Sequence, residues 1–531
     1  MLHLRFYTAL LLVPLVAGHK SYFAEFEDTI QTLQLNYFNG TTWPDAENWQ
    51  TAVLDTLLAA SEISITNALQ EYGGNVPGEN PSPSDTPNVL IQKYFSNNVD
   101  AYGGEDVGQI FGDAYDDEQW VVLEWLEVLK FIHRYDDYAS SDLGKSYIDE
   151  FAHRAHIFYD DVQKAYDTSL CDGGLTWQPK LATYKNAITN ELFISSSIKM
   201  YLYFPGDTNT DGMPTPNTTT VRGQPIGPLP TLQAQDPSLL DNAKKEYEWF
   251  KSHNFLNSQG LVVDGFHISA GQTQCDQRNE MVYTYNQGVL LEGLRGLWEA
   301  TGDVTYLNDG YTYINSVMNA TGWNNGEPKT DGQWNGLGRN GYLEDYCDMD
   351  GSCSNDAMLF KGIYFHNLNT FCEALPTDQA LIPGVTTTAP SSLASSHDNT
   401  CAGYKNWVQH NADGAINSRD PTTAIIGGWW AVNSPNTDSS KRSIISKPVL
   451  PAGAVDIINQ PWILATDPWK CEGVDGCLVN ENISIKRSAM SSDISKRSAT
   501  QYTVQTQGSG LAVIEAASDF ELKPAGYWRL K

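Results

Sequence analysis

Two adjacent carboxylates stand out in the sequence because their surroundings favour acid–base chemistry. Asp116 and Asp117 lie in the run Ala-Tyr-Asp-Asp-Glu-Gln-Trp (114–120), directly ahead of a strongly amphipathic stretch. Glycosidic-bond cleavage uses such a pair, since one carboxylate attacks or stabilises an oxocarbenium-like carbon and the other protonates the departing oxygen. A retaining mechanism needs the two carboxyl groups about 5 Å apart. Adjacent side chains splay apart within a regular helix, so we expect the pair in the first turn or the preceding loop.

The tripeptide Tyr-Asp-Asp is a weak signal by itself, because it occurs three times, at 115–117, 135–137 and 159–161. We expect the second copy at a solvated helix end and the third as surface charge beside a helix. Only the first precedes a helix with a Trp on its first turn and follows a Gly-rich approach. An acid in that position can alternatively cap the helix.

Aromatic and amide side chains elsewhere in the chain are candidates for sugar contacts. Trp177 follows the glycines of Cys-Asp-Gly-Gly-Leu-Thr-Trp (171–177), where tight turns are permitted. A loop Trp packed on the rim of the fold, or an Asn capping a helix, is the structural alternative. The candidate substrate-binding residues are Tyr115, Trp120 and Trp177 for stacking, and Asn186, Tyr285, Asn286 and Gln287 for polar contacts.

Composition limits the classes of partner. The formal net charge of −31 argues against nucleic acid and anionic membranes, which both require clusters of Lys and Arg. A neutral polymer is the easier partner, and 15 Trp and 27 Tyr provide abundant stacking surface. We expect no cofactor and no metal site, because the 10 His are scattered and no Cys-x-x-Cys spacing occurs. The protein is expected to be a monomer.

The N-terminus reads as a secretory signal over residues 1–18, with a short apolar run and a small-residue exit at Val16-Ala17-Gly18. No later stretch is long enough to span a bilayer, and the C-terminal residues lack the apolar tail of a lipid-anchor signal. Eight cysteines indicate disulfides, with Cys347/Cys353 and Cys471/Cys477 close enough for local bridges. Glycosylation sequons occur at Asn39, Asn217, Asn319 and Asn482.

Helical periodicity runs from about residue 24 to residue 416. Within 118–133, Val122, Trp125, Leu126, Leu129 and Ile132 recur at three- and four-residue steps, and Glu118, Glu124, Glu127 and Lys130 form the other side. Similar segments with turn-rich separators give ten to twelve helices and no convincing alternating strands. Helices joined by short turns form antiparallel hairpins, so we predict an all-α fold, an (α/α)6 barrel with a largely irregular C-terminal extension.

Three stretches differ from this pattern. Residues 75–87 must be a loop, and the Pro- and Thr-rich 204–234 is an exposed excursion beside the cleft. From 431 onward helical periodicity is lost, and dibasic pairs follow at 441–442, 486–487 and 496–497 as processing sites or as part of a linker. A strand-like patch spans 501–506 and 511–514. The expected division is a signal peptide (1–18), a glycosidase domain (19–430) and an extension (431–531).

Five blocks in register over roughly residues 24–430 resemble glycoside hydrolase family 76, the α-1,6-mannanases with fungal cell-wall relatives. They are 115–120, 173–177, 184–187, 284–288 with 301–303, and 360–363. The resemblance implies an (α/α)6 barrel and a retaining endo-enzyme acting on α-1,6-linked mannan. It also implies that Asp116 is the nucleophile and Asp117 the general acid/base. A fungal source suits the dibasic pairs.

The expected function is therefore that of a secreted hydrolase that cleaves internal α-1,6-mannosidic bonds. The expected location is extracellular, which includes the cell wall. Three alternatives stay open. A cell-wall transglycosylase would use the same carboxylates, and a non-catalytic mannan-binding wall protein would keep the barrel without needing both acids. An unsaturated uronidase would require Arg and Lys for its anionic sugars, which this acidic chain scarcely supplies.

Overall fold

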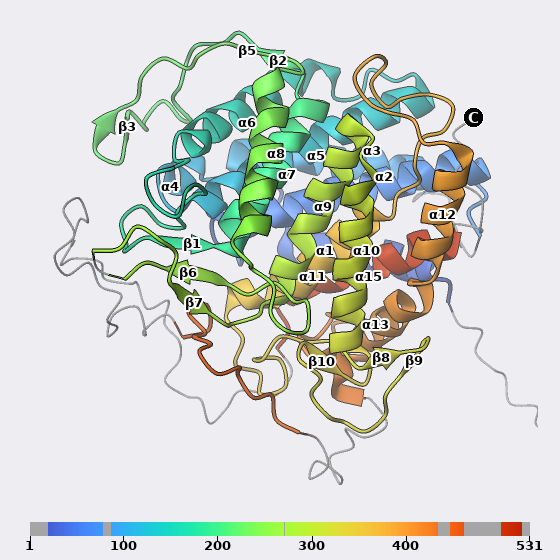
Figure 1. Cartoon of the computed structure of the whole chain (residues 1–531). Helices are drawn as coiled ribbons and strands as arrows, with labels where there is room; N and C mark the ends of the chain where they lie inside the picture. Colours follow the sequence, from blue (N-terminus) through green and yellow to red (C-terminus); the bar gives the residue numbers. More distant parts are fainter. Residues whose placement is uncertain (1–19, 78–85, 270, 434–445, 461–500, 523–531) are drawn as a thin grey trace, which may run out of the picture.

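The computed structural model describes residues 20–77, 86–269, 271–433, 446–460 and 501–522. Helices dominate this part of the chain, and Figure 1 shows them packed side by side along the body of the molecule. The helices are α1 (Tyr22–Tyr37), α2 (Trp49–Tyr72), α3 (Pro87–Gly104), α4 (Val107–Ile110), α5 (Tyr115–Ala139), α6 (Ile148–Gln163), α7 (Ala187–Tyr203), α8 (Pro237–Ser252), α9 (Thr284–Thr301), α10 (Val304–Ala320), α11 (Asn355–Phe371), α12 (Ser391–Ala402), α13 (Lys405–Asn417) and α15 (Val504–Leu522).

Six of these helices form a closed inner ring. Each neighbour packs on the next in the order α2, α5, α7, α9, α11, α15, and α15 packs again on α2. The outer helices alternate with them along the chain, α3 lying on α2, α6 on α5, α8 on α7, α10 on α9, and both α13 and α1 on α15. The predicted (α/α)6 barrel is confirmed. Because inner and outer helices form antiparallel pairs, all six inner helices run in the same direction.

Helix α15 corrects the expected division of the chain at residue 430. The predicted strand patch at 501–506 and 511–514 is wrong, since Val504–Leu522 is a helix buried over almost its whole length. This helix is the sixth member of the inner ring, so the ring closes only with residues from the predicted extension. Gly362 of α11 has no room for a side chain, because a Cβ there would lie 2.5 Å from the Cα of Ser509. Because α15 is buried on nearly every side, polar residues such as Gln505, Gln507 and Glu515 also lie inside the protein and no amphipathic period develops.

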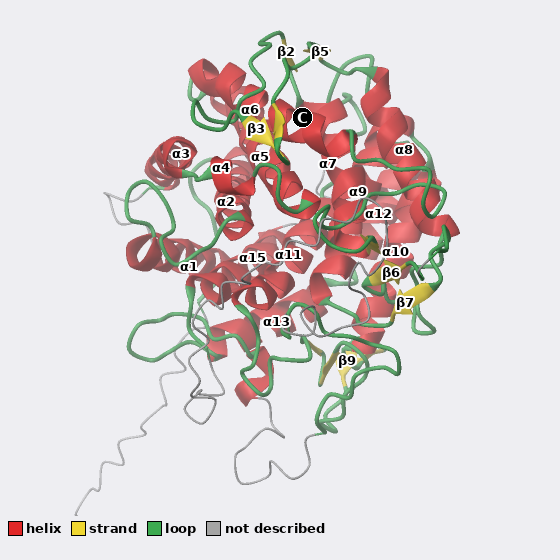
Figure 2. Ribbon diagram, turned by 90° about the vertical axis from the view of Figure 1, so that its left-hand side faces the viewer, coloured by secondary structure: helices red, strands yellow, loops and turns green. Residues whose placement is uncertain are grey.

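Within the part of the chain that the structure describes, strands occur only as short pieces in the loops (Figure 2). β1 (Tyr184–Asn186), β6 (Gly265–His267) and β7 (Gln277–Asn279) form an antiparallel sheet in the order β1-β6-β7. The remaining pairs are β2 (Gly206–Asp207) with β5 (Leu232–Gln233), β3 (Thr220–Val221) with β4 (Gln224–Pro225), β8 (Trp323–Asn324) with β9 (Glu327–Pro328), and β10 (Gly338–Arg339) with β11 (Tyr342–Leu343). These strands were not predicted, because two or three residues are too few for an alternating pattern to develop.

Two further expectations need correction. The predicted polar side of the segment 118–133 does not face water, since Glu118, Glu124 and Glu127 of α5 are buried. An inner helix is enclosed by neighbouring helices and loops, so its polar residues are buried within the protein. Helix α2 is long and apolar enough to cross a bilayer, contrary to expectation, but 94% of that stretch is buried inside the barrel.

Three disulfides join described cysteines: Cys171–Cys275, Cys347–Cys353 and Cys372–Cys401. The expected local bridge between Cys347 and Cys353 is confirmed. The signal peptide, the dibasic pairs, Cys471/Cys477 and Asn482 lie outside the described residues, as does 78–85 of the predicted loop. The described sequon residues Asn39, Asn217 and Asn319 are all exposed, so their side chains are accessible for glycosylation.

Candidate active site

The adjacent aspartates lie in the first turn of the inner helix α5, as predicted. Asp116 and Asp117 are the second and third residues of the helix, which begins at Tyr115. Asp116 is 9% exposed, whereas Asp117 is partly exposed. Because all inner helices begin at the same end of the barrel, this position places the pair among the first turns of α7, α9 and α11.

The loop 171–177 fixes the beginning of α5. The backbone N–H of Tyr115 donates to the carbonyl of Trp177 (3.0 Å), and the N–H of Trp177 donates to the carbonyl of Tyr184 in β1 (2.8 Å). The buried Lys185 donates from Nζ to the carbonyl of Gly174 (2.6 Å). Gly174 has a φ of +77°, and a Cβ would lie 2.6 Å from the ring of Trp249. The two glycines are therefore needed for the loop to pass this ring.

The surroundings of the two carboxylates raise both pKa values but treat the two acids differently. Burial raises the pKa of Asp116 to about 7, and hydrogen bonds from the backbone N–H groups of Asp116 and Asp117 and from the Trp177 indole oppose the rise. Burial raises the pKa of Asp117 well above its ordinary value, and the negative charges of Asp116, Asp113 and Asp356 raise it further. Asp117 is thus the acid that holds a proton, while Asp116 has donors for its ionised form.

A second group of polar side chains surrounds Asp264, which follows the 261–263 segment and precedes β6. The Tyr184 hydroxyl donates to Asp264, and Asn286 Nδ2 lies 3.4 Å from Asp264 Oδ1. Burial raises the pKa of Asp264 to about 6 against these hydrogen bonds. Burial and the charges of Asp264, Asp116 and Asp356 raise the pKa of Tyr285, which lies among these acids.

Three buried oxygen atoms in this region have no hydrogen-bond partner among the described residues. They are Asp116 Oδ1, Asn186 Oδ1 and Asn286 Oδ1. Buried polar atoms are nearly always paired in native proteins, and exceptions concentrate where a ligand or water completes the set. Unpaired acceptors on three inner-helix N-terminal segments therefore mark the region as a candidate site for a hydroxyl-rich ligand.

Aromatic rings lie beside the pair. Trp120 stacks on Trp49 with ring centroids 5.6 Å apart, and Tyr285 stacks on Phe360 at 3.7 Å. Trp120 and Tyr285 are buried, whereas Trp177 is partly exposed. Of the predicted stacking residues, Trp177 therefore has the ring face best placed to meet a ligand.

Two predicted contacts are occupied by the protein itself. Gln287 Nε2 donates to the carbonyls of Val262 and Tyr283, and Gln287 Oε1 accepts from the N–H of Val262. These bonds tie α9 to the segment before β6 and leave the amide no donor for a sugar. The ring of Tyr115 is covered by Arg222, whose Cζ lies 4.3 Å from the ring centroid.

Sequence reasoning missed Asp264, Asp356 and Trp49. Asp356 lies in the first turn of α11, and its Oδ1 accepts from Gln50 Nε2 (2.7 Å). Trp49 is the first residue of α2. Both share with Asp116 the position at the N-terminal end of an inner helix, and that shared position was the signal available in the sequence.

The third Tyr-Asp-Asp also departs from its prediction as surface charge. Asp160 is buried and pairs with Lys164, and Asp161 pairs with Arg222 Nη1 (2.6 Å). The second copy lies in the last turn of α5, as expected.

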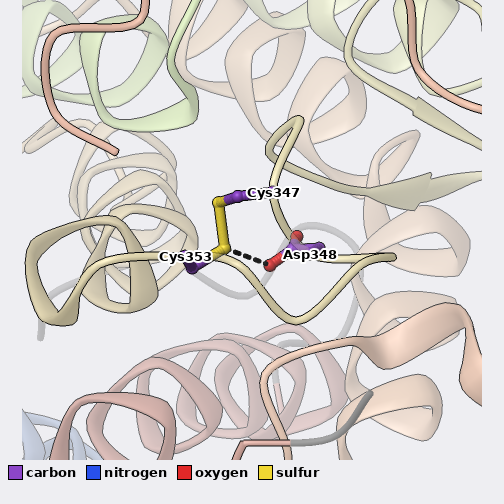
Figure 3. A group of neighbouring side chains, drawn as sticks. All are labelled: Cys347, Asp348 and Cys353. Atoms are coloured by element: carbon purple, nitrogen blue, oxygen red, sulfur yellow. Dashed lines mark hydrogen bonds between the residues drawn. A yellow bond between two sulfur atoms is a disulfide. The ribbon is translucent and has the colours of Figure 1, made fainter. Parts of the chain in front are cut away.

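Two groups of side chains come close enough together to suggest a metal site, but each is already engaged. Figure 3 shows the first, in which Cys347 and Cys353 form a disulfide and Cys353 Sγ lies 3.4 Å from Asp348 Oδ1. The second contains Glu127, Glu292 and His366. Lys199 Nζ donates to both of its glutamates at 2.6 Å, so a cation already occupies the position between them.

Comparisons with known proteins show similarity to one family of glycosidases. Residues 230–426 match the sequence model described as glycosyl hydrolase family 76. The mannan endo-1,6-alpha-mannosidase DFG5 of Saccharomyces cerevisiae is 23% identical over 283 residues, 50% of each chain. A putative mannan endo-1,6-alpha-mannosidase of Schizosaccharomyces pombe is 22% identical over 271 residues, 49% of this chain and 50% of the relative. The chain spans about half the length of the curated relatives it matches.

Solved structures share the fold at low sequence identity. Dfg5 from Chaetomium thermophilum in complex with glucosamine has a TM-score of 0.52 at 13% identity, covering 94% of this chain and 90% of that one. An inactive variant of an α-1,6-mannanase from Salegentibacter, in complex with α-1,6-mannotriose, has a TM-score of 0.51 at 14% identity, covering 94% and 100%.

Proposed function

We propose that the chain is a member of glycosyl hydrolase family 76, whose sequence model matches residues 230–426, and that it is an endo-hydrolase that cleaves α-1,6-mannosidic bonds of mannan with retention. The observation that carries the proposal is the Asp116–Asp117 pair. Both aspartates lie in the first turn of α5, but they differ in the hydrogen bonds that they accept. The names of the yeast relatives as mannan endo-1,6-alpha-mannosidases support the same linkage and sugar. A mannose polymer is neutral, which suits a chain of net charge −31.

The two acids divide the chemistry according to their surroundings. Asp116, ionised with help from the Trp177 indole and two backbone N–H groups, attacks the anomeric carbon and forms a glycosyl ester. Asp117, protonated, gives its proton to the departing glycosidic oxygen. Asp117 then removes a proton from water, which attacks the anomeric carbon and releases Asp116 as a carboxylate.

Substrate recognition falls to groups with free faces or free acceptors. Trp177 offers a partly exposed ring for stacking, and Asn186 and Asn286 offer unpaired Oδ1 atoms to sugar hydroxyls. Trp120, stacked on Trp49, forms an apolar floor. Gln287 acts through the backbone of Val262 and holds α9 in place.

The location that suits this activity is outside the cell. Exposed sequons at Asn39, Asn217 and Asn319, three disulfides and the apolar segment of 1–18 support secretion or cell-wall association. We further infer that a single chain suffices for catalysis, because both acids and their donors come from one barrel.

Product analysis on linear α-1,6-mannan tests the proposal. We expect oligosaccharides of mixed length early in the reaction, and an α-anomer as the first product by proton NMR. Single mannose units as the only product would contradict endo-cleavage, and a β-anomer would contradict retention. A parallel incubation with a glucan acceptor identifies transfer, because hybrid chains form only if a sugar rather than water resolves the ester.

A further inference from the structure

The excursion 204–234 carries one arginine that reaches the catalytic helix. Its strands β3 and β4 form a hairpin whose two connecting residues, Arg222 and Gly223, have φ values of +48° and +78°. Positive φ at both positions is the geometry of the two-residue turns that match the twist of a hairpin. The side chain of Arg222 therefore projects from the tip of a rigid turn. In Figure 2 the β3 strand lies beside α5 and α6.

Arg222 contacts the residues on both sides of the aspartate pair. Its Nη2 lies 2.9 Å from Glu118 Oε1, and its Cζ lies 4.3 Å from the centroid of the Tyr115 ring. Its Nη1 reaches Asp161 of α6 at 2.6 Å. The planar guanidinium thus bridges two acids while it stacks on an aromatic ring, a combination that lysine does not reproduce.

The Glu118 contact bears directly on the start of α5. Glu118 is fully buried, and its Oε1 also accepts from the backbone N–H of Gly112 (3.1 Å). Burial and the charge of Asp161 raise the pKa of Glu118, and the Arg222 charge opposes them. Arg222 therefore favours the ionised acceptor that holds the 112–114 turn against the first turn of the helix.

The hairpin also packs against the 112–114 turn. Gly112 has a φ of +81°, and a Cβ there would lie 2.8 Å from Val221 Cγ2. The tip of the hairpin therefore packs directly on the turn before Asp116, with no room for a side chain at Gly112.

We propose that Arg222 is a positioning residue that fixes the place of the Asp116–Asp117 pair, because it stacks on Tyr115 and pairs with Glu118 on either side of the two aspartates. The inference rests on the proposed function, since it concerns the geometry of the proposed catalytic pair. Arg222 does not touch the substrate in this proposal. Misplacing reacting groups by about 1 Å costs on the order of 100-fold in rate.

Steady-state kinetics on α-1,6-mannan test this role with four variants: Arg222→Gln, Arg222→Lys, Glu118→Gln and the double variant Arg222→Gln/Glu118→Gln. We expect Arg222→Gln to lose on the order of 100-fold in kcat with KM changed less than about threefold. Arg222→Lys keeps the charge and should recover part of the loss. Because Arg222 acts through Glu118, the double variant Arg222→Gln/Glu118→Gln should lose no more than the worse single variant. Full additivity, or near-normal kcat in both Arg222 variants, would overturn the proposal; if the Gln variant does not fold, the Lys variant decides alone.

Arg419→Gln is the matched control. Arg419 is about as exposed as Arg222, with side chains 20% and 23% exposed, and it pairs with Glu25 of α1. A similar kcat loss in this control would assign the effect to general destabilisation. Amide hydrogen exchange of residues 112–118 gives a readout independent of mannan, and it should accelerate only in Arg222→Gln. A wild type without mannanase activity would refute the function alone, whereas unchanged exchange in Arg222→Gln would refute the positioning role.

Discussion

Two carboxylate-rich regions lie at different depths in the same ring of inner helices, and they differ in whether a cation accompanies the acids. At the N-terminal ends are Asp116, Asp117 and Asp356, which we call the acid rim. Deeper in the barrel Lys199 Nζ donates to Glu127 and Glu292 at 2.6 Å each, and we call these three residues the lysine core. Glu127 follows Asp116 by eleven residues on α5, or about 16 Å at 1.5 Å per residue.

The pKa values follow this difference. Burial alone would raise the pKa of Glu127, but the charges of Lys130 and Lys199 outweigh it and hold that pKa below its ordinary value. Burial raises the pKa of Asp117, and neighbouring negative charges raise it further. Among the described residues, no ion pair involves Asp116, Asp117 or Asp356.

Burial is therefore common to the two regions, and the missing cation distinguishes the reactive one. The lysines of the core region keep the pKa of Glu127 low, and this ion pair serves the fold. Burial without a cation raises the pKa values of the rim acids, at a cost to stability that a proton-transfer site accepts.

The largest expected effect is the loss of activity when the rim is neutralised. Asp116→Asn and Asp117→Asn should each lower kcat on linear α-1,6-mannan by on the order of 10⁴-fold, with the helical circular dichroism unchanged. Asp137→Asn alters the second Tyr-Asp-Asp on the same helix and is the matched control, expected to be fully active. Near-normal turnover in either rim variant would end the assignment.

Removing the cation from the lysine core should damage the fold. Lys199→Met removes the cation shared by Glu127 and Glu292 and leaves Glu127 only its longer contact with Lys130 (3.5 Å), so we expect a loss of about 3–5 kcal/mol in the free energy of unfolding. Lys251→Met removes a more exposed pair with Asp309 (3.1 Å) and should cost less than about 1 kcal/mol. Chemical denaturation measures both, and equal losses would show that the buried network carries no special role.

The Asp116→Asn variant should be more stable than the wild type at high pH. The pKa of Asp116 is raised to about 7 in the folded protein, so the folded state holds a proton that the unfolded state releases above pH 4. Stability therefore falls as pH rises through this window. Asp116→Asn removes that penalty and should gain on the order of 2–4 kcal/mol at pH 8. The gain should vanish near pH 4. Thermal melts at pH 8 and at pH 4 measure this difference, and an equal gain at both pH values would contradict the prediction.

The smallest expected effect is a shift in pH dependence. The negative charge of Asp356 raises the pKa of Asp116, so Asp356→Asn should lower it. Since Asp116 acts as a carboxylate, the acidic limb of kcat/KM should move to lower pH. An acidic limb that moves to higher pH, or does not move, would show that the charge of Asp356 does not raise the pKa of Asp116.

Local patterns in the sequence were sufficient for the inner helix that carries the pair. The apolar spacing in 118–133 predicted a helix, and the structure has α5 over Tyr115–Ala139 with the aspartates in its first turn. The same spacing placed Glu124 and Glu127 on the side opposite the apolar residues, and the structure buries both. Periodicity shows that two faces differ in polarity, but only the tertiary structure shows that the polar residues are buried.

The sixth inner helix, α15, could not be predicted from the sequence because it lacks a periodic pattern. Amphipathic periodicity arises where one side of a helix faces water. Helix α15 is buried on nearly every side, so its polar residues, such as Gln507 and Glu515, are mixed with apolar ones without a period. The pairing of Asp161 with Arg222 was likewise invisible, because it joins α6 to a hairpin tip 61 residues away.

Residue order alone determined the adjacency of Asp116 and Asp117, the helix that begins beside them, and the repeated helical hairpins, since each depends on contacts within a few turns. Tertiary packing decided which acids receive a lysine and which oxygens stay unpaired. Those properties depend on charge and burial supplied by distant segments, and no local pattern encodes them.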